Sequence, residues 1–376
     1  MKTFTGFTHG VGIGGWLTNY KRLAIIEKSK RMVISQGDLE HFDSYITKWD
    51  VENIASFGAD HIRFPFDQIV VEEFDTPFRY REEILCKMEE FFDWCAAAGL
   101  HVLLNCHHAI GAYCDCGDER DLCVNPERRE RFKAMWLMME ERFHDREHVA
   151  FELLNELPSN DYDEWNSLAD ETLSAIRAKN RDRIIVMGGA EYNSVGALYK
   201  LHTWDDENVV YTFHFYTPHE FTHQRGLLAG MQHIYNREMP YPGSMERYRD
   251  FRRFCGWDVG DYGKYERMDR EWLWKQLQPA ANWVQTHPDK ILYNGEFGTI
   301  RHCPLPYRIA WCRDVIAFCQ KHEIPYSIWN YLSTPYDGNR FSIVDDDHRQ
   351  ILSPDYVHLI RGELDKLTIA EPYITE

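Results

Sequence analysis

Short apolar runs rich in β-branched and aromatic residues alternate with longer amphipathic stretches along this 376-residue chain, and they do so eight times. The runs predict strands at 7–17, 59–66, 100–108, 148–156, 183–191, 208–216, 290–298 and 324–332. The stretches between them predict helices at 47–57, 82–98, 126–145, 162–179, 270–285, 307–322 and 354–367. Such alternation implies parallel strands joined by right-handed crossovers, and eight of them close into a barrel.

The predicted fold class is therefore α/β, a (β/α)8 TIM barrel. The alternative is an open, doubly wound sheet, but the stretch 12–15 lacks the G-x-G-x-x-G spacing of a phosphate cradle. Residues 217–269, after the sixth strand, are too many for an ordinary βα loop. We interpret them as a partly helical insertion that caps the cleft, lined by aromatic residues such as Trp257, and the whole chain, 1–376, as one domain.

Charge and composition exclude several classes of partner. The chain has 42 basic and 60 acidic side chains, a net charge of −18, which would repel nucleic acid or an anionic membrane surface. It has no apolar run of the ~18 residues that mark a membrane-spanning helix. Residues 1–10 do not resemble a secretory signal, and the 10 scattered cysteines indicate reduced thiols. We therefore expect a cytoplasmic or non-classically released protein, unless a signal precedes this sequence, with no obligate protein partner evident.

Four cysteines, Cys106, Cys114, Cys116 and Cys123, raise the question of a metal site, because a Cys-x-Cys pair can chelate. Their spacing fits no common zinc pattern, which favours a structural or incidental role. The sequence therefore predicts neither a metal nor an organic cofactor.

Polar and aromatic side chains gather where the predicted strands end. They are Trp16, Arg63, His107, His108, Asn155, Glu156, Glu191, His214, Tyr216, Glu296 and Trp329. In a TIM barrel these positions build one pocket, so we expect the side chains to meet. Singly, each has a structural alternative: Arg63 can bridge strands, and Trp16 or Trp329 can fill the core. His107 and His108 are consecutive, so at most one of them enters the pocket.

Glu156 and Glu296 are harder to explain by structure alone. Each ends an apolar run at the barrel mouth. A carboxylate there either forms an ion pair or takes part in the chemistry of the site. An ion pair with Arg63 could satisfy one of them. Glycoside hydrolysis needs one protonated and one ionised carboxyl group, and Asn155 beside Glu156 fits a donor to a sugar 2-hydroxyl. Tyr216 and Arg63 could hold Glu296 as an anion.

Six motifs carry a resemblance to a known family. They are 61–65 (HIRFP), 104–111 (LNCHHAIG), 151–156 (FELLNE), 213–216 (FHFY), 294–298 (NGEFG) and 328–331 (IWNY). In order and spacing they resemble glycoside hydrolase family 5 over nearly the whole chain. The segments 14–16 (GGW), 146–150 (REHVA), 221–224 (FTHQ) and 241–243 (YPG) are similar to the clostridial endoglucanase C group of that family.

The resemblance implies a retaining β-glycosidase with Glu156 as acid/base and Glu296 as nucleophile. The residues expected to bind substrate or support catalysis are Arg63, His107, Asn155, His214, Tyr216 and Trp329, with Trp16 and His108 as further candidates. The implied activity is endo-acting cleavage of β-1,4-glucosidic bonds in cellulose-type and mixed-linkage β-1,3-1,4-glucans, with Trp329 stacked on the sugar ring. A retaining enzyme requires the two carboxyl groups to lie about 5–5.5 Å apart.

The chain departs from the family pattern at two places. Leu157 separates Glu156 from Pro158, where the family often has proline directly after the glutamate, and Asn105-Cys106 stand where it frequently carries Asp. Neither departure removes a catalytic atom.

Other functions remain as alternatives. An exo-β-1,3-glucanase or a β-mannanase of the same family is the nearest, because loops set linkage preference. A non-catalytic carbohydrate-binding barrel would keep Trp16 and Trp329 but has no use for both glutamates. A metal-dependent hydrolase would need His-x-His on one strand, and no predicted strand end supplies it.

Overall fold

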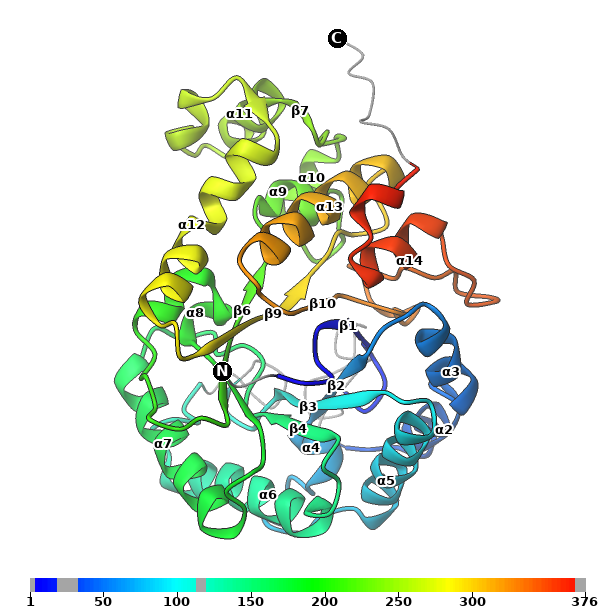
Figure 1. Ribbon diagram of the computed structural model, residues 1–376, viewed down its shortest axis with the longest axis vertical. Coiled ribbons are helices and arrows are strands. Elements are labelled where there is room, and N and C mark those ends of the chain that lie inside the picture. Colours follow the sequence, from blue (N-terminus) through cyan, green and yellow to red (C-terminus); the bar gives the residue numbers. More distant parts are fainter. Residues whose placement is uncertain (1–3, 19–32, 113–119, 369–376) are drawn as a thin grey trace.

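Eight parallel strands form a closed barrel in the computed structural model, which describes residues 4–18, 33–112 and 120–368 (Figure 1). In chain order they are β1 (His9–Gly12), β2 (His61–Asp67), β3 (His101–His108), β4 (Val149–Glu152), β5 (Ile185–Gly188), β6 (Val209–Phe215), β9 (Ile291–Phe297) and β10 (Tyr326–Ile328). Each pairs with the next one along the chain, and β10 pairs with β1 to close the barrel. The predicted TIM barrel is confirmed, and every barrel strand overlaps a predicted run.

The strands are shorter than the predicted runs. The run 148–156 forms a strand only over Val149–Glu152. Beyond it, the Leu153 N–H still donates to the Val186 carbonyl at 3.2 Å, and the Asn155 N–H donates to the Cys106 carbonyl at 2.9 Å. The chain after β4 is therefore held along the barrel rim, although it is no longer regular strand.

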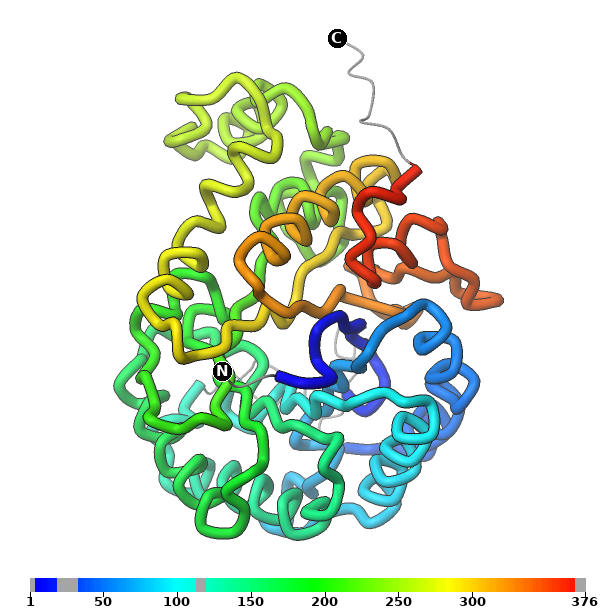
Figure 2. The backbone as a smooth tube through the Cα atoms, viewed as in Figure 1, coloured from blue at the N-terminus to red at the C-terminus, as the bar shows by residue number. Residues whose placement is uncertain are grey.

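Helices cover the outside of the barrel, as the tube in Figure 2 shows. The predicted ones are α3 (Lys48–Ser56), α5 (Glu82–Ala97), α6 (Pro126–Phe143), α7 (Tyr162–Lys179), α12 (Arg270–Thr286), α13 (Leu305–Lys321) and α14 (Pro354–Arg361). The prediction of α14 extended to residue 367, which was too far. Gly362 ends the helix in the left-handed conformation (φ 70°), which glycine adopts without strain. In the described part of the chain, no helix has the length and apolar content to cross a bilayer.

Several short helices were not predicted. They are α2 (Gln36–Ser44), α4 (Gln68–Val71), α8 (Ala190–Asn193) and the 3-10 helix η2 (Val195–Tyr199), whereas the 3-10 helix η4 (Leu364–Lys366) lies within the predicted range 354–367. A capping box begins α2: the Ser35 and Asp38 side chains each accept the backbone N–H of the other. Between β5 and β6, α8 and η2 stand where a longer helix is usual.

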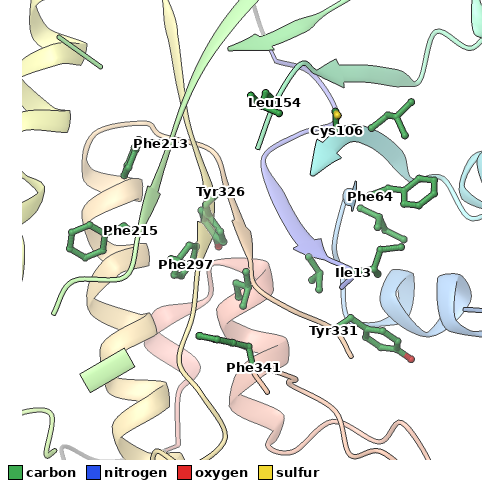
Figure 3. Close-up of a cluster of buried hydrophobic side chains, with 14 of the residues drawn as sticks. Ile13, Phe64, Cys106, Leu154, Phe213, Phe215, Phe297, Tyr326, Tyr331 and Phe341 are labelled. Atoms are coloured by element: carbon green, nitrogen blue, oxygen red, sulfur yellow. The ribbon is translucent and has the colours of Figure 1, made fainter. Parts of the chain in front are cut away.

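Two buried clusters pack the barrel. The smaller lies inside, at the amino-terminal ends of the strands, and contains Phe4, Phe7, Leu103, Ala150, Val186, Val210 and Tyr293. Phe4 and Phe7 stack with ring centroids 4.4 Å apart and fill this end of the barrel. The larger cluster includes the side chains between strands and helices, among them Phe213 and Phe215 of β6 and Phe297 of β9 (Figure 3). Apolar packing at the amino-terminal end leaves the carboxyl end for polar side chains.

The insertion after β6 is partly helical, as predicted. It contains α9 (His219–Thr222), α10 (Met231–Tyr235), β7 (Gly243–Ser244), α11 (Met245–Phe254), η3 (Gly260–Lys264) and β8 (Arg267–Met268), and β7 pairs antiparallel with β8. Its α11 and β7 lie at the upper end of the molecule in Figure 1.

This insertion makes contacts at the rim and outside the barrel. Near its start, the Leu227 N–H donates to the Gly338 carbonyl in the loop after β10, at 3.2 Å. Further on, the Tyr241 hydroxyl donates to Asp314 of α13 at 2.9 Å. The insertion therefore links the barrel rim with the outer helix layer.

Trp257, expected in the cleft, belongs to the outer part of the insertion. Its ring packs edge-on against Phe251, with centroids 5.9 Å apart, and beneath the Arg252 guanidinium. The side chain is 47% exposed. These contacts lie within the insertion itself, and a role for Trp257 in lining the cleft stays a prediction.

Candidate active site

Polar side chains from four strands and the segments that follow them meet at the carboxyl end of the barrel. Six of the residues that the sequence placed at strand ends come together there: Arg63, Asn155, Glu156, His214, Tyr216 and Glu296. Glu156 and Tyr216 are partly exposed, whereas the other four are buried. Solvent can therefore reach the group at Glu156 and Tyr216, while its other members are buried.

Arg63, in the middle of β2, is the centre of this group and is completely buried. Its Nε and Nη2 each donate to Glu152 at 2.7 Å, Nη2 also donates to the Asn155 Oδ1 at 2.7 Å, and Nη1 donates to Glu296. Burial alone would lower the pKa of Arg63, but the charges of Glu152 and Glu296 outweigh it and raise the pKa. The guanidinium therefore stays charged and joins β2 to β4 and β9.

Glu296, in β9, accepts hydrogen bonds from two sides. Arg63 holds its Oε1, and the Tyr216 hydroxyl donates to its Oε2 at 2.9 Å. Burial, together with the charges of Glu296 and Glu156, raises the pKa of Tyr216 well above its ordinary value, so the phenol remains a donor. A guanidinium and a phenol that donate to the same carboxyl group fix its orientation.

Glu156 faces this carboxyl group from the loop after β4. Its Oε1 lies 2.8 Å from Nδ1 of His214. The same Nδ1 lies 3.8 Å from Oε2 of Glu296. One potential ligand atom from each of the three residues lies within 4.8 Å of the others. A single imidazole thus stands close to both carboxyl groups, which are themselves close together.

Burial lowers the pKa of His214 to about 4, even though the charge of Glu296 opposes this shift. The ring is therefore neutral near pH 7 and carries one N–H. Its Nε2 is buried without a hydrogen-bond partner among the residues that the structure describes. Two arrangements are open to the other nitrogen: Nδ1–H donates to an ionised Glu156, or a protonated Glu156 donates to a bare Nδ1. The two arrangements differ in the tautomer of the ring and in whether Glu156 carries a proton.

Trp329 and His107 form a second part of the site. Their rings stack with centroids 5.5 Å apart at an angle of 9°, and both side chains are partly exposed. The backbone of β1 approaches the indole so closely that a Cβ at Gly12 would lie 2.7 Å from a ring carbon. The neighbouring His108 has other contacts: its Nδ1 lies 2.6 Å from Oδ1 of Asp67, and its ring is turned 85° from that of His107.

Two residues that the sequence placed with this group lie elsewhere. Trp16 is buried, and its ring stacks on Phe64 with centroids 5.0 Å apart and packs against Phe91 of α5. It therefore belongs to the layer between the barrel and its helices. Glu191 follows β5, is 42% exposed, and pairs with Lys200 at 3.2 Å.

Glu152 is a residue of this group that the sequence analysis missed. It is completely buried at the end of β4 and forms two hydrogen bonds with Arg63. The available signal was a lone charged residue inside the apolar run 151–154, because a buried carboxylate needs a cationic partner. The sequence also contains the partner, Arg63, which the sequence analysis assigns only to Glu156 or Glu296.

Two sets of residues carry side chains that can bind a metal ion. Glu156, His214 and Glu296 offer oxygen and nitrogen atoms within 4.8 Å of one another, a donor set that zinc accepts. Of the cysteine cluster, Cys114 and Cys116 lie outside the described residues.

The other two cysteines of that cluster, Cys106 and Cys123, are buried free thiols. Burial raises the pKa of Cys123 to about 12 and that of Cys106 well above its ordinary value. Both are therefore protonated at neutral pH, whereas metal binding requires thiolates.

Comparison with known proteins places this site in context. The model of the cellulase family, glycosyl hydrolase family 5, matches residues 27–334. Endoglucanase C of Acetivibrio thermocellus is 34% identical over 363 residues, which cover 94% of this chain and 98% of that protein. The crystal structure of endoglucanase Cel5A from Thermotoga maritima superposes with a TM-score of 0.71 at 24% identity, covering 93% of this chain and 96% of the other. Structures of the same protein with cellobiose and with mannotriose are similar, each with a TM-score of 0.70.

Proposed function

Because the chain belongs to glycoside hydrolase family 5, we propose that it is an endo-acting, retaining hydrolase of β-1,4-glucosidic bonds in cellulose-type and mixed-linkage β-glucans. The observation that carries this proposal is the approach of Glu156 to Glu296, with one oxygen of each within 4.8 Å. Carboxyl groups about 5–5.5 Å apart are typical of retaining enzymes, whereas inverting enzymes leave room for a water between them. The match to an endoglucanase over nearly its whole length supports β-glucan as the substrate.

In the first step, Glu296 would act as the nucleophile. Arg63 and Tyr216 orient its carboxylate, which would attack the anomeric carbon of the sugar. Glu156, protonated at this stage, would give its proton to the departing glycosidic oxygen. The bond between the two sugars breaks as the glycosyl–Glu296 ester forms, and the released sugar leaves with a hydroxyl group.

In the second step, a water would replace the released sugar. Glu156, now ionised, would take a proton from the water as the water oxygen attacks the anomeric carbon and releases Glu296. Two successive displacements at one carbon retain its configuration. His214 suits this exchange, because its neutral ring can donate through Nδ1–H to the ionised Glu156.

Two further residues would bind the sugar at the point of cleavage. The Oδ1 of Asn155 accepts a hydrogen bond from Arg63, which directs the amide NH2 group, and that group would donate to the 2-hydroxyl. Trp329 would stack its indole on the sugar ring, because an aromatic face suits the C–H face of a β-pyranose. Its stack on His107 would hold the indole in place.

Reducing-end assays on carboxymethyl cellulose, barley β-glucan, laminarin and mannan test the proposed substrate. We expect activity on the first two, with viscosity falling early relative to reducing-end release, as endo action requires. Activity confined to laminarin or mannan would replace β-1,4-glucan with one of the alternative substrates. Binding without hydrolysis of any polymer would mean a carbohydrate-binding barrel.

Two substitutions of glutamate provide a matched control. Glu296→Gln should abolish hydrolysis, because the neutral amide is a poor nucleophile. Glu191→Gln should retain wild-type rates, because that carboxylate is 42% exposed and paired with Lys200.

A further inference from the structure

Arg63 donates two hydrogen bonds to Glu152 but only one to Glu296. Its Nε donates to one oxygen of Glu152 and its Nη2 to the other, both at 2.7 Å, which is the two-pronged geometry of a strong arginine–carboxylate pair. Glu296 receives Nη1 alone. The side chains of Arg63 and Glu152 have no exposed surface, whereas that of Glu296 is 6% exposed. Glu152 therefore fixes the plane from which Arg63 reaches Glu296.

The charges of these three side chains do not cancel. One guanidinium lies between two carboxylates, so the ionised group carries a net charge of −1. Charges interact strongly where water is excluded, and Glu152 therefore draws on the same positive charge that acts on Glu296. Without Glu152, the full charge of Arg63 would act on Glu296 and make its oxygens less nucleophilic.

We propose that Glu152 is a positioning residue of the reaction: it anchors the guanidinium of Arg63 and takes up part of its charge, so that Arg63 orients Glu296 without neutralising it. This inference rests on the proposed function, in which Glu296 is the nucleophile. Glu152 acts only through Arg63 and is not assigned a contact with the sugar.

A purely structural role is the competing explanation. A buried arginine needs a partner, and removal of one member of a buried ion pair is strongly destabilising whatever the function. Loss of stability therefore cannot distinguish the two roles. The pH dependence of the first chemical step can, because only a charge effect on Glu296 would move it.

The other titratable groups around this ion cluster have to be considered in that measurement. They are Cys106 of β3, His214 of β6, Tyr293 of β9, Tyr216 after β6 and Glu156 after β4. Burial raises the pKa of the thiol and of both phenols well above their ordinary values, so these three stay neutral. The charge of Glu152 acts to raise the pKa of His214. Its removal would therefore lower the pKa of His214, and the acidic limb is also expected to shift to lower pH.

The test uses 2,4-dinitrophenyl β-cellobioside, whose leaving group needs no proton, so that the acidic limb of kcat/KM reports on the nucleophile side of the site. In Glu152→Gln, we expect this limb to shift to lower pH by about one unit and kcat/KM at the optimum to fall about tenfold. The inhibition constant of cellobiose should stay unchanged, because Glu152 is not expected to contact the sugar.

Glu152→Asp is the matched control, because it keeps the charge but shortens the side chain. Its acidic limb should stay at the wild-type pH, while kcat/KM falls as the guanidinium is drawn away from Glu296. Wild-type kcat/KM and an unmoved limb in Glu152→Gln, with or without loss of thermal stability, would overturn the inference. If Glu152→Gln does not fold, wild-type kcat/KM in Glu152→Asp would overturn it instead.

The same assay separates this inference from the proposed function. Turnover of the cellobioside by the wild type, and its loss in Glu296→Ala, test the proposed function alone. An inactive wild type would overturn that function. If the wild type is active and Glu152→Gln has the same kcat/KM and the same acidic limb, only the role of Glu152 is overturned.

Discussion

Nδ1 of His214 lies 2.8 Å from Oε1 of Glu156, and burial keeps the imidazole neutral by lowering its pKa to about 4. The neutral ring can therefore present Nδ1–H to an ionised Glu156 in one tautomer, or a bare Nδ1 to a protonated Glu156 in the other, with its own proton then on Nε2. A protonated imidazole would instead donate permanently to Glu156 and favour its ionised form. The low pKa of His214 is thus compatible with both roles that we propose for Glu156, first as an acid and then as a base.

The pKa of His214 predicts a specific dependence of stability on pH. In the unfolded chain a histidine binds a proton near pH 6.5, whereas the folded protein binds it only near pH 4. The unfolded state therefore binds more protons between these values, so stability is lost as pH falls from 6.5 to 4 and levels off below. The loss is on the order of 3 kcal/mol.

Denaturant unfolding of the wild type and of His214→Asn at pH 7.5 and pH 4.5 measures this effect. The variant lacks the titrating ring, so the stability advantage of the wild type should shrink at the lower pH. An advantage that is equal at both pH values would show that His214 is not held neutral by the fold.

Trp16 and Trp329 should respond in opposite ways to the same substitution. Trp16→Ala removes a buried ring packed on Phe64 and Phe91 and should cost about 3–5 kcal/mol of folding free energy, with kcat/KM of the folded fraction retained. Trp329→Ala should lower kcat/KM at least about tenfold and leave the unfolding midpoint close to wild type. Calorimetry and kinetics on both variants check this. Wild-type kinetics in Trp329→Ala would reassign that ring to packing.

Gly12 should be required for activity without contacting substrate. An added Cβ would lie 2.7 Å from the Trp329 ring, so Gly12→Ala should displace the indole and lower kcat/KM several-fold, with an overpacking cost of about 1–3 kcal/mol. Gly196→Ala is the control, because its added Cβ would lie 4.0 Å from Oγ of Ser194, beyond van der Waals overlap. Equal kinetics of the two variants would contradict the proposed position of the indole.

Metal removal should leave the reaction unchanged, because two carboxyl groups can run it alone. Dialysis against EDTA is expected to retain full activity. Added zinc should inhibit in competition with cellobiose, because Glu156, His214 and Glu296 offer it one nitrogen and two oxygen ligands within the site. Activity lost on dialysis and restored by zinc or calcium would show that a metal takes part.

The barrel could be predicted from the sequence because its signal is local and repeated. Each strand is a short apolar run, and each intervening amphipathic stretch shows a helical period, so eight repeats leave few alternatives. The gathering of Arg63, Glu156 and Glu296 followed from topology alone, since parallel strands bring their carboxyl ends to one edge of the barrel. The helix end at Gly362 was missed, although glycine there was the available signal.

Other features depend on contacts that are distant in sequence. Trp16 ends a predicted strand, as Trp329 does, but only the packing of helix α5 shows that it faces Phe64 and Phe91. Glu152 becomes interpretable once its hydrogen bonds to Arg63 are known, because the two are 89 positions apart in the chain. The insertion has no repeating pattern, so its contact with the loop after β10 could not be predicted.

The roles of Glu296 and Glu156 in a retaining reaction are the central claim, and the anomeric configuration of azide-rescue products tests it most directly. Glu296→Ala leaves space for azide on the nucleophile side, so a single displacement on 2,4-dinitrophenyl β-cellobioside should yield α-cellobiosyl azide. Glu156→Ala keeps the nucleophile, so azide should attack the glycosyl–Glu296 ester and yield the β-azide. Proton NMR of the two products distinguishes them. The account predicts α from Glu296→Ala and β from Glu156→Ala; the reverse pair, or the same anomer from both variants, would contradict it.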